Sequence, residues 1–194
     1  MLKLRNTLIA VGTFITFFIT TSIVLGLSNV STPAELTVRS TAFNNEGQIS
    51  LKYVCTRIPG GENVSLPLEW SAGPQGTKSY AILMYDLSPV ANNHVHWAVT
   101  NIPSRVTSFK EGISRTQFIP AGTLELSNTS GQVGYEGPCP PQGTGSHKYR
   151  IVVVALNTNN LDISGSVSVD KFEAMVKDKV LAQGEIAGYY PSLY

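Results

Sequence analysis

An uncharged apolar segment near the N-terminus limits how much of this chain can fold in water. Residues 8–27 are mostly Leu, Ile, Val, Phe and Thr, and they follow two basic residues, Lys3 and Arg5. A signal-peptide core runs about 7–15 residues and a membrane-spanning helix needs about 20. Residues 1–30 are therefore predicted to be an N-terminal signal-anchor or signal peptide, and the poor cleavage site at 24–26 favours the anchor slightly. Because positive flanks stay in the cytoplasm, the rest of the chain is expected outside it, membrane-anchored or secreted.

The charge balance of the remaining chain excludes whole classes of partner. Setting residues 1–30 aside leaves 164 of the 194 residues, enough for one domain with a sizeable core. The chain has 14 Lys and Arg against 13 Asp and Glu, so losing Lys3 and Arg5 leaves 12 against 13, a net charge of −1. Binding to nucleic acid through released counterions needs far more positive charge. A basic patch that grips anionic membranes is equally unsupported.

The pattern of apolar residues predicts a mainly β domain with few helices. Strands are expected at 36–43, 49–54 (an edge segment), 79–85, 95–102, 149–156 and 181–189. The run Ile-Val-Val-Val at 151–154 is typical of a strand buried on both faces. One helix is expected, with Asp170 and Glu173 as a capping box and Phe172, Met175, Val176 and Val180 as its apolar stripe. Residues 31–42 are assigned to a linker and first strand, and 43–194 to one domain.

Polar groups that can do chemistry gather around the long Gly- and Pro-rich stretch at 111–145. His96 begins one predicted strand and Asp86 follows another, while His147 and Tyr149 share one face of a third. If the strands of His96 and His147 are neighbours, these four side chains can converge beside the Gly-rich loop. Two imidazoles, a phenol and backbone N–H groups that point at an anion are suited to a ligand the size of phosphate.

Other chemistries remain open at this point. Zinc could use His94 with Asp86, His96 and His147, because these are zinc-ligand types. Cys139 could be a nucleophile activated by His147. The chain has no Gly-x-Ser-x-Gly elbow, no Walker loop and no dinucleotide fingerprint.

Two cysteines and three sequons add expectations tied to export. Cys55 and Cys139 are either paired or two buried thiols; a bridge would close a loop of 84 residues, worth about 4 kcal/mol in the chain-entropy model. Asn29, Asn63 and Asn128 each begin an Asn-x-Ser/Thr sequon and are possible glycan sites.

Several short motifs in a fixed order resemble one known family. They are Tyr53-Val54-Cys55 with Glu-Asn-Val-Ser-Leu-Pro-Leu-Glu-Trp at 62–70, Gly-Thr-Lys-Ser-Tyr at 76–80 with Met-Tyr-Asp at 84–86, His-Trp-Ala-Val-Thr-Asn-Ile-Pro at 96–103, Tyr-Glu-Gly-Pro-Cys-Pro-Pro at 135–141 with Gly143 and His-Lys-Tyr at 147–149, and Val-Leu-Ala at 180–182 with Gly-Tyr at 188–189. Together they resemble the phosphatidylethanolamine-binding protein family, in its prokaryotic Raf-kinase-inhibitor-like branch. The likeness covers roughly residues 43–190.

The resemblance implies a fold, a pocket and a function. The fold is a central antiparallel sheet with a second, smaller sheet and one or two peripheral helices. The pocket binds phosphate-type anions or phospholipid headgroups, and no cofactor, metal or enzymatic reaction is expected. The matching positions imply pocket roles for Asp86, His96, His147 and Tyr149, with Gly137, Pro140 and Pro141 shaping the wall. The resemblance also strengthens the disulfide between Cys55 and Cys139.

The sequence departs from the family pattern in two places. Ser88 stands near the position of the family's second acid, which predicts a pocket with one carboxylate fewer. Residues 57–60 look like an insertion after Cys55, which bears on the local loop shape and on the geometry of the bridge.

The function predicted from these observations is an extracytoplasmic, membrane-tethered binder of a small anion, with His96 and His147 donating hydrogen bonds to it. The alternative is an inhibitor or interaction module that acts on a protease or a kinase-like partner through loops at 56–61 and 127–134. A metal-dependent hydrolase is the remote alternative.

Overall fold

The structure, a computed structural model, describes residues 34–163 and 165–192 of the chain. They belong to one compact unit, Thr32–Tyr194. The predicted signal-anchor or signal peptide at 1–30 lies outside the described residues, as does the sequon at Asn29. Within the described part, no helix is long and apolar enough to cross a membrane.

The described residues form ten strands, one α-helix and two short 3-10 helices. The strands are β1 (Ala34–Glu35), β2 (Val38–Arg39), β3 (Gly47–Gln48), β4 (Leu68–Trp70), β5 (Ser79–Asp86), β6 (Val95–Pro103), β7 (Ser108–Phe109), β8 (Leu124–Glu125), β9 (Ser146–Leu156) and β10 (Val180–Pro191). The helices are α1 (Val169–Val176) and the 3-10 turns η1 (Leu51–Tyr53) and η2 (Pro89–Ala91). The prediction of a mainly β domain with a second small sheet is confirmed.

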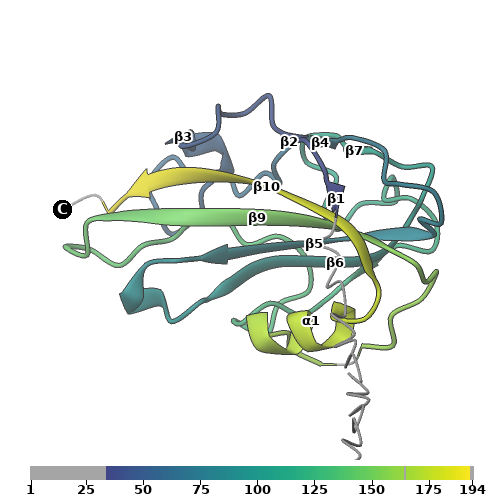
Figure 1. The fold of residues 1–194 in the computed structure, drawn as a ribbon. Coiled ribbons are helices and arrows are strands. Elements are labelled where there is room, and N and C mark those ends of the chain that lie inside the picture. Colours follow the sequence, from purple (N-terminus) through teal and green to yellow (C-terminus); the bar gives the residue numbers. More distant parts are fainter. Residues whose placement is uncertain (1–33, 164, 193–194) are drawn as a thin grey trace, which may run out of the picture. The chain divides into compact units, whose positions relative to one another are not determined.

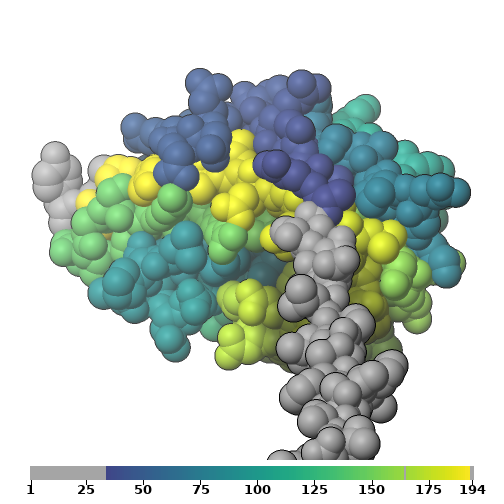
Figure 2. Space-filling model, in the orientation of Figure 1, coloured from purple at the N-terminus to yellow at the C-terminus, as the bar shows by residue number. Residues whose placement is uncertain are grey.

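Two sheets make up the fold (Figure 1). The large sheet runs β1-β10-β9-β5-β6-β8, with β3 also paired to β10, and the small sheet runs β2-β4-β7. The four long strands pair antiparallel, as predicted, whereas the two-residue strands β1 and β3 add to β10 in parallel and make the sheet mixed. The early segment of the chain, in purple, therefore lies alongside the yellow β10 (Figure 2).

The large sheet is buried on both faces because its central strands are apolar at nearly every position. Every residue of β5 is buried. Tyr80, Ile82 and Met84 join Trp70 and Phe109 of the small sheet in one core, while the alternate residues of β5 join Phe172 of α1 in the other. Because both faces of the large sheet are apolar and must be covered, α1 and the small sheet lie on opposite sides of it (Figure 1).

Two predicted strands near the N-terminus are wrong in length or type. The strand expected at 36–43 is reduced to β2, because the Ser40 hydroxyl donates to Pro67 O at 2.6 Å and accepts the N–H of Ala42 at 3.1 Å, which turns the chain. The edge segment expected at 49–54 is largely the 3-10 turn η1, whose i→i+3 bonds include Tyr53 N–H to Ser50 O at 3.1 Å.

The predicted helix exists, but its N-cap lies two residues before the expected one. Ser168, not Asp170, is the N-cap, and its hydroxyl accepts the Lys171 N–H at 3.2 Å. Phe172 and Val176 are buried as the stripe predicts. Val180, assigned to that stripe, instead begins β10.

The two sequons within the described residues differ in access. The Asn128 side chain is fully buried and accepts the N–H of Gln132, so the folded domain cannot carry a glycan there. The Asn63 amide is half-buried and also has a structural use, which is described below.

Candidate functional site

The predicted anion site lies where three strands of the large sheet end together. Asp86 is the last residue of β5, and in the β5–β9 register it lies opposite Tyr149. β5 separates β6 from β9, so the strands of His96 and His147 are not the paired neighbours that the sequence argument assumed. Their side chains converge because each flanks the same end of β5. A bulge helps, since Met84 pairs with Trp97 and Tyr85 with Val95, which leaves His96 as the extra residue.

A cavity of about 200 Å³ opens at this end of the sheet. Asp86, His96, His147 and Pro141 line it, as the sequence predicted. Tyr149 is not a lining residue: it is fully buried, with its ring 5.2 Å from the ring of His96 in an edge-to-face contact. Gly137 and Pro140 are not lining residues either.

We call Asp86, Thr144 and His147 the inner half of the pocket. These three side chains are linked by a continuous series of hydrogen bonds. Oδ2 of Asp86 lies 2.6 Å from Nδ1 of His147, and Oδ1 accepts the Ser88 N–H at 2.8 Å. Thr144 donates its hydroxyl proton to Pro141 O at 2.6 Å, so at 2.8 Å it can only accept from Nε2 of His147. Both ring nitrogens of His147 are therefore occupied within the protein.

His96 is oriented by a backbone carbonyl rather than by a carboxylate. Its Nδ1 lies 2.9 Å from the carbonyl O of Glu136, which can only accept, so the proton is on Nδ1. Burial, aided by nearby His94, lowers the pKa of His96 to about 4. At neutral pH the ring is thus uncharged and its Nε2 accepts hydrogen bonds. The prediction that His96 donates a hydrogen bond to an anion does not fit this state.

The outer half of the pocket, Arg57, His94, Ser130 and Glu136, is centred on a carboxylate to which the sequence argument gave no role. Oε2 of Glu136 accepts from Ser130 Oγ at 2.7 Å and lies 3.3 Å from His94 Nε2, while Oε1 accepts from Arg57 at 3.2 Å. The hydrogen bond with His94, ahead of that from Ser130, lowers the pKa of Glu136 to about 2 against the opposing effect of burial. The pocket therefore keeps two carboxylates, although Ser88 stands where the family pattern has its second acid.

Only weak signals in the sequence point to Glu136 and Arg57. Glu136 lies inside the Tyr-Glu-Gly-Pro motif, and Arg57 lies in the insertion that follows Cys55. Neither could be placed without knowing that the two segments face each other.

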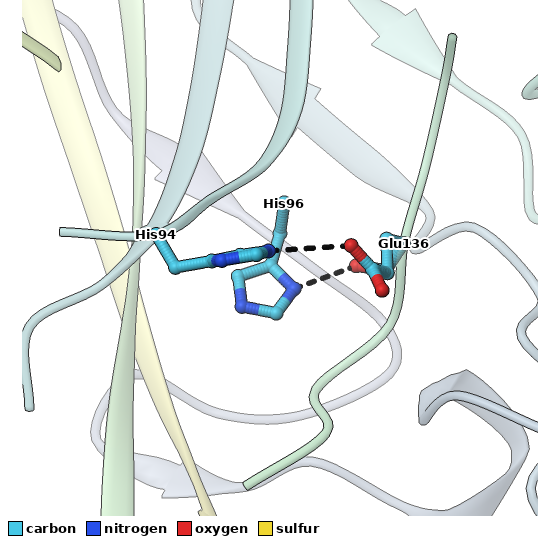
Figure 3. Close-up of side chains that lie close together, drawn as sticks. All are labelled: His94, His96 and Glu136. Atoms are coloured by element: carbon cyan, nitrogen blue, oxygen red, sulfur yellow. Dashed lines mark hydrogen bonds and ion pairs between the residues drawn. The ribbon is translucent and has the colours of Figure 1, made fainter. Parts of the chain in front are cut away.

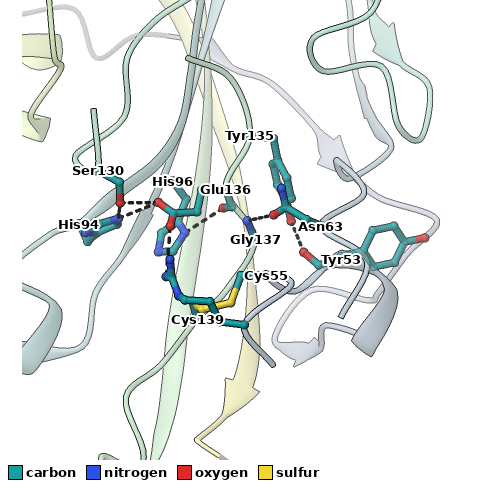
Figure 4. Close-up of a disulfide and its surroundings, with 11 residues drawn as sticks. Tyr53, Cys55, Asn63, His94, His96, Ser130, Tyr135, Glu136, Gly137 and Cys139 are labelled. Atoms are coloured by element: carbon teal, nitrogen blue, oxygen red, sulfur yellow. Dashed lines mark hydrogen bonds and ion pairs between the residues drawn. A yellow bond between two sulfur atoms is a disulfide. The ribbon is translucent and has the colours of Figure 1, made fainter. Parts of the chain in front are cut away.

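The wall of the pocket at 136–141 is fastened to the segment at 53–63 (Figure 4). Cys55 and Cys139 form a disulfide with Cα atoms 5.5 Å apart, so the insertion does not prevent the bridge. The amide oxygen of Asn63 accepts the Gly137 N–H at 2.7 Å. A Cβ on Gly137 would collide with the Tyr53 carbonyl, so only glycine allows this approach. Gly137 thus shapes the wall from behind it.

The structure bears on two of the alternatives drawn from the sequence, the thiol nucleophile and the zinc site. A thiol nucleophile is excluded, because Cys139 is in the disulfide. The four zinc ligands expected from the sequence do not form one group. Among the described residues, the metal-ligand types that gather are His94, His96 and Glu136, whose ligand atoms lie within 4.8 Å of one another.

Comparison with known proteins places this pocket in a family. Residues 39–191 match the family model described as phosphatidylethanolamine-binding protein. A UPF0098 protein of Methanothermobacter thermautotrophicus is 35% identical over 156 residues, which cover 80% of this chain and 98% of that protein. The crystal structure of Escherichia coli YbcL, described as a member of the mammalian PEBP family, superposes with a TM-score of 0.73 at 32% identity and covers 81% of this chain and 98% of that one.

One relative bears on location. A Mycobacterium tuberculosis protein with the provisional name lipoprotein LppC is 36% identical over 132 residues, which cover 66% of this chain and 61% of that protein.

The family model spans every element from β3 to β10, both halves of the pocket and the disulfide. The chain belongs to the phosphatidylethanolamine-binding protein family.

Proposed function

We propose that this protein is an extracytoplasmic binding protein whose pocket takes a small phosphate-type ligand, of the kind found in phosphomonoesters and phospholipid headgroups. The observation that carries the proposal is the convergence of the buried Asp86–His147 pair, uncharged His96 and the Arg57–Glu136 ion pair on one small cavity. A cavity of about 200 Å³ is smaller than those that hold drug-sized molecules, about 300–1,000 Å³, and suits a headgroup fragment.

The charges support a ligand that has both an anionic group and a hydrogen-bond donor. Arg57 is the cation with the most freedom, because 68% of its side chain is exposed, and a guanidinium binds phosphate through paired N–H donors. Nε2 of His96 is an acceptor and matches an ammonium or hydroxyl group of the ligand. Phosphoethanolamine carries both kinds of group, whereas inorganic phosphate tests the anionic half alone.

The experiment is isothermal titration of the full chain with O-phosphoethanolamine and, separately, with inorganic phosphate, in buffer with EDTA. Arg57→Ala should weaken binding about 10- to 150-fold, because a charge-assisted hydrogen bond contributes about 1.5–3 kcal/mol. Arg39→Ala is the matched control, since Arg39 also pairs with a glutamate, Glu69, but on the small sheet. Failure of both ligands to bind at millimolar concentration, or equal weakening by both variants, would overturn the proposal. Equal affinity for both ligands would assign recognition to the phosphate alone.

The extracytoplasmic location rests on the leader and on the provisional lipoprotein name of the mycobacterial relative. Intact-mass spectrometry of the protein from its own host membranes tests it. A mass that includes residues 1–30 supports a tether, and a shorter mass indicates cleavage. Recovery of the full-length chain from the cytosol would contradict the location. Inhibition of a protease or a kinase-like partner stays an untested prediction.

A further inference from the structure

The outer half of the pocket brings together two imidazoles and a carboxylate that the proposed function does not need as a set. His94 lies just before β6, His96 lies two residues later, and Glu136 comes from the loop fastened by the disulfide (Figure 3). The two rings have their centroids 4.8 Å apart, and Nε2 of His94 faces the Glu136 carboxylate at 3.3 Å. All three residues line the cavity.

We propose that His94, His96 and Glu136 form a three-ligand site for a divalent transition-metal ion, with Zn²⁺ as the fitting ion and its fourth position open to the cavity. Two histidines and one glutamate are a ligand set that zinc accepts when it keeps one position for water or a ligand. Mg²⁺ and Ca²⁺ prefer oxygen ligands and six or more of them, so a site with two nitrogens disfavours both. This inference goes beyond the proposed anion binding and does not depend on it.

The orientation of His96 is the strongest sign of a ligand role. A metal-bound histidine normally donates its other ring N–H to a carbonyl or carboxylate, which fixes the tautomer and aims the free nitrogen. Nδ1 of His96 makes this bond to the Glu136 carbonyl at 2.9 Å and leaves the lone pair on Nε2. His147 cannot serve, because both of its nitrogens are engaged by Asp86 and Thr144.

Only a small adjustment closes the site. Zinc binds nitrogen and oxygen at about 2.0–2.2 Å in tetrahedral geometry, so two ligand atoms on one ion lie about 3.4 Å apart. The ligand atoms here lie within 4.8 Å of one another, so the widest pair must close by up to about 1.4 Å. His94 can supply this shift because 29% of its side chain is exposed and its hydrogen-bond contacts are long, 3.3 Å to Glu136 and 3.4 Å to Ser130.

The test is a zinc titration of the full chain, without a histidine tag and stripped with EDTA, followed by isothermal calorimetry. One Zn²⁺ should bind per chain, Mg²⁺ should not, and Co²⁺ should give a visible absorption band that reports nitrogen and oxygen ligands. His94→Ala and Glu136→Gln should each weaken zinc binding by more than about 100-fold, the upper end of the loss that removal of a supporting outer-sphere contact causes. His94 is partly exposed, so its variant is expected to fold, which far-UV circular dichroism checks.

The chain has three histidines, so His147 provides the matched control. His147→Gln, once far-UV circular dichroism shows that it is folded, should keep zinc binding within a few-fold, although it disturbs the inner half. Absence of one-to-one zinc binding, or zinc binding that survives His94→Ala, overturns the inference. Zinc binding lost equally in His94→Ala and His147→Gln also overturns it and points to the ligand set expected from the sequence. Because the phosphoethanolamine titration is run in EDTA, anion binding and zinc binding can each fail without the other.

Discussion

The inner and outer halves of the pocket use the same residue types and reach opposite states. In the inner half, Asp86 and His147 are almost completely buried, each carboxylate oxygen of Asp86 has a partner, and both ring nitrogens of His147 are engaged. In the outer half, buried Glu136 shares its carboxylate among three partners, Arg57, His94 and Ser130, and all three reach the solvent. A buried imidazole with no free ring nitrogen can only hold its place. A pair whose partners are exposed can exchange them for a ligand.

The largest expected effect comes from breaking the inner half. Asp86→Ala leaves His147 without its partner in a buried site, which typically costs about 3–5 kcal/mol. The free energy of unfolding from urea denaturation measures this loss. Thr144→Val, which removes the hydrogen bonds to Pro141 O and to His147 Nε2, should cost about 2 kcal/mol. A loss below about 1 kcal/mol for Asp86→Ala would show that the inner half is not held more rigidly than the outer half.

Removing the disulfide should cost less but should act on the outer half. The double variant Cys55→Ala/Cys139→Ala opens a loop of 84 residues, and such a change typically costs about 2–4 kcal/mol. Urea denaturation gives the stability, and the phosphoethanolamine titration gives the affinity. We expect affinity to fall as well, because the bridge holds the loop that carries Glu136. Lost stability with unchanged affinity would separate the bridge from the pocket.

The pH dependence of stability should report the titration of His96, which lies between the two halves of the pocket. Its pKa is about 4 in the folded protein against an ordinary value of 6.5, and the groups that face it are His94, Glu136 and Asp86. Between these pH values the unfolded chain binds a proton that the folded protein does not. Stability is therefore complete above pH 6.5 and declines as the pH falls towards 4, by at most about 1.4 kcal/mol per pH unit.

Urea midpoints measured from pH 7 to pH 4 in EDTA check this expectation. His96→Gln keeps an amide that can donate to the Glu136 carbonyl but does not titrate, so its stability should change less over the same range. Curves of equal slope for the two proteins would assign the acid sensitivity to other groups. Glu136, with its pKa lowered to about 2, acts in a separate window: its contribution is present above pH 4.5 and is lost only towards pH 2.

The smallest effect on stability is expected for Arg57→Ala. Its ion pair with Glu136 joins an exposed side chain to a buried one, and surface pairs of this kind contribute at most about 1 kcal/mol. The thermal midpoint should therefore change little, while anion affinity falls. A stability loss as large as that of Asp86→Ala would mean that the outer half is as rigid as the inner half.

Local pattern was enough to predict the main elements of the fold. The apolar run at 151–154 predicts a strand covered on both faces, and the structure buries it in β9 between two cores. The motifs around Asp86, His96 and His147 identified the family and three of the residues that line the cavity. The strand expected at 36–43 failed because a serine hydroxyl bond to a distant carbonyl, at Pro67, ends it after two residues.

The sequence by itself determined that this is an exported-looking, near-neutral β domain of a recognisable family, because periodicity, charge and motif order are local properties of the chain. Only the tertiary structure decided which groups carry protons and which can meet a ligand. Glu136 joins His94 and His96 across about 40 residues of chain, and the carbonyl of the same residue sets the tautomer of His96. Burial and hydrogen-bond partners fix these states, and both arise from contacts between segments that no local pattern records.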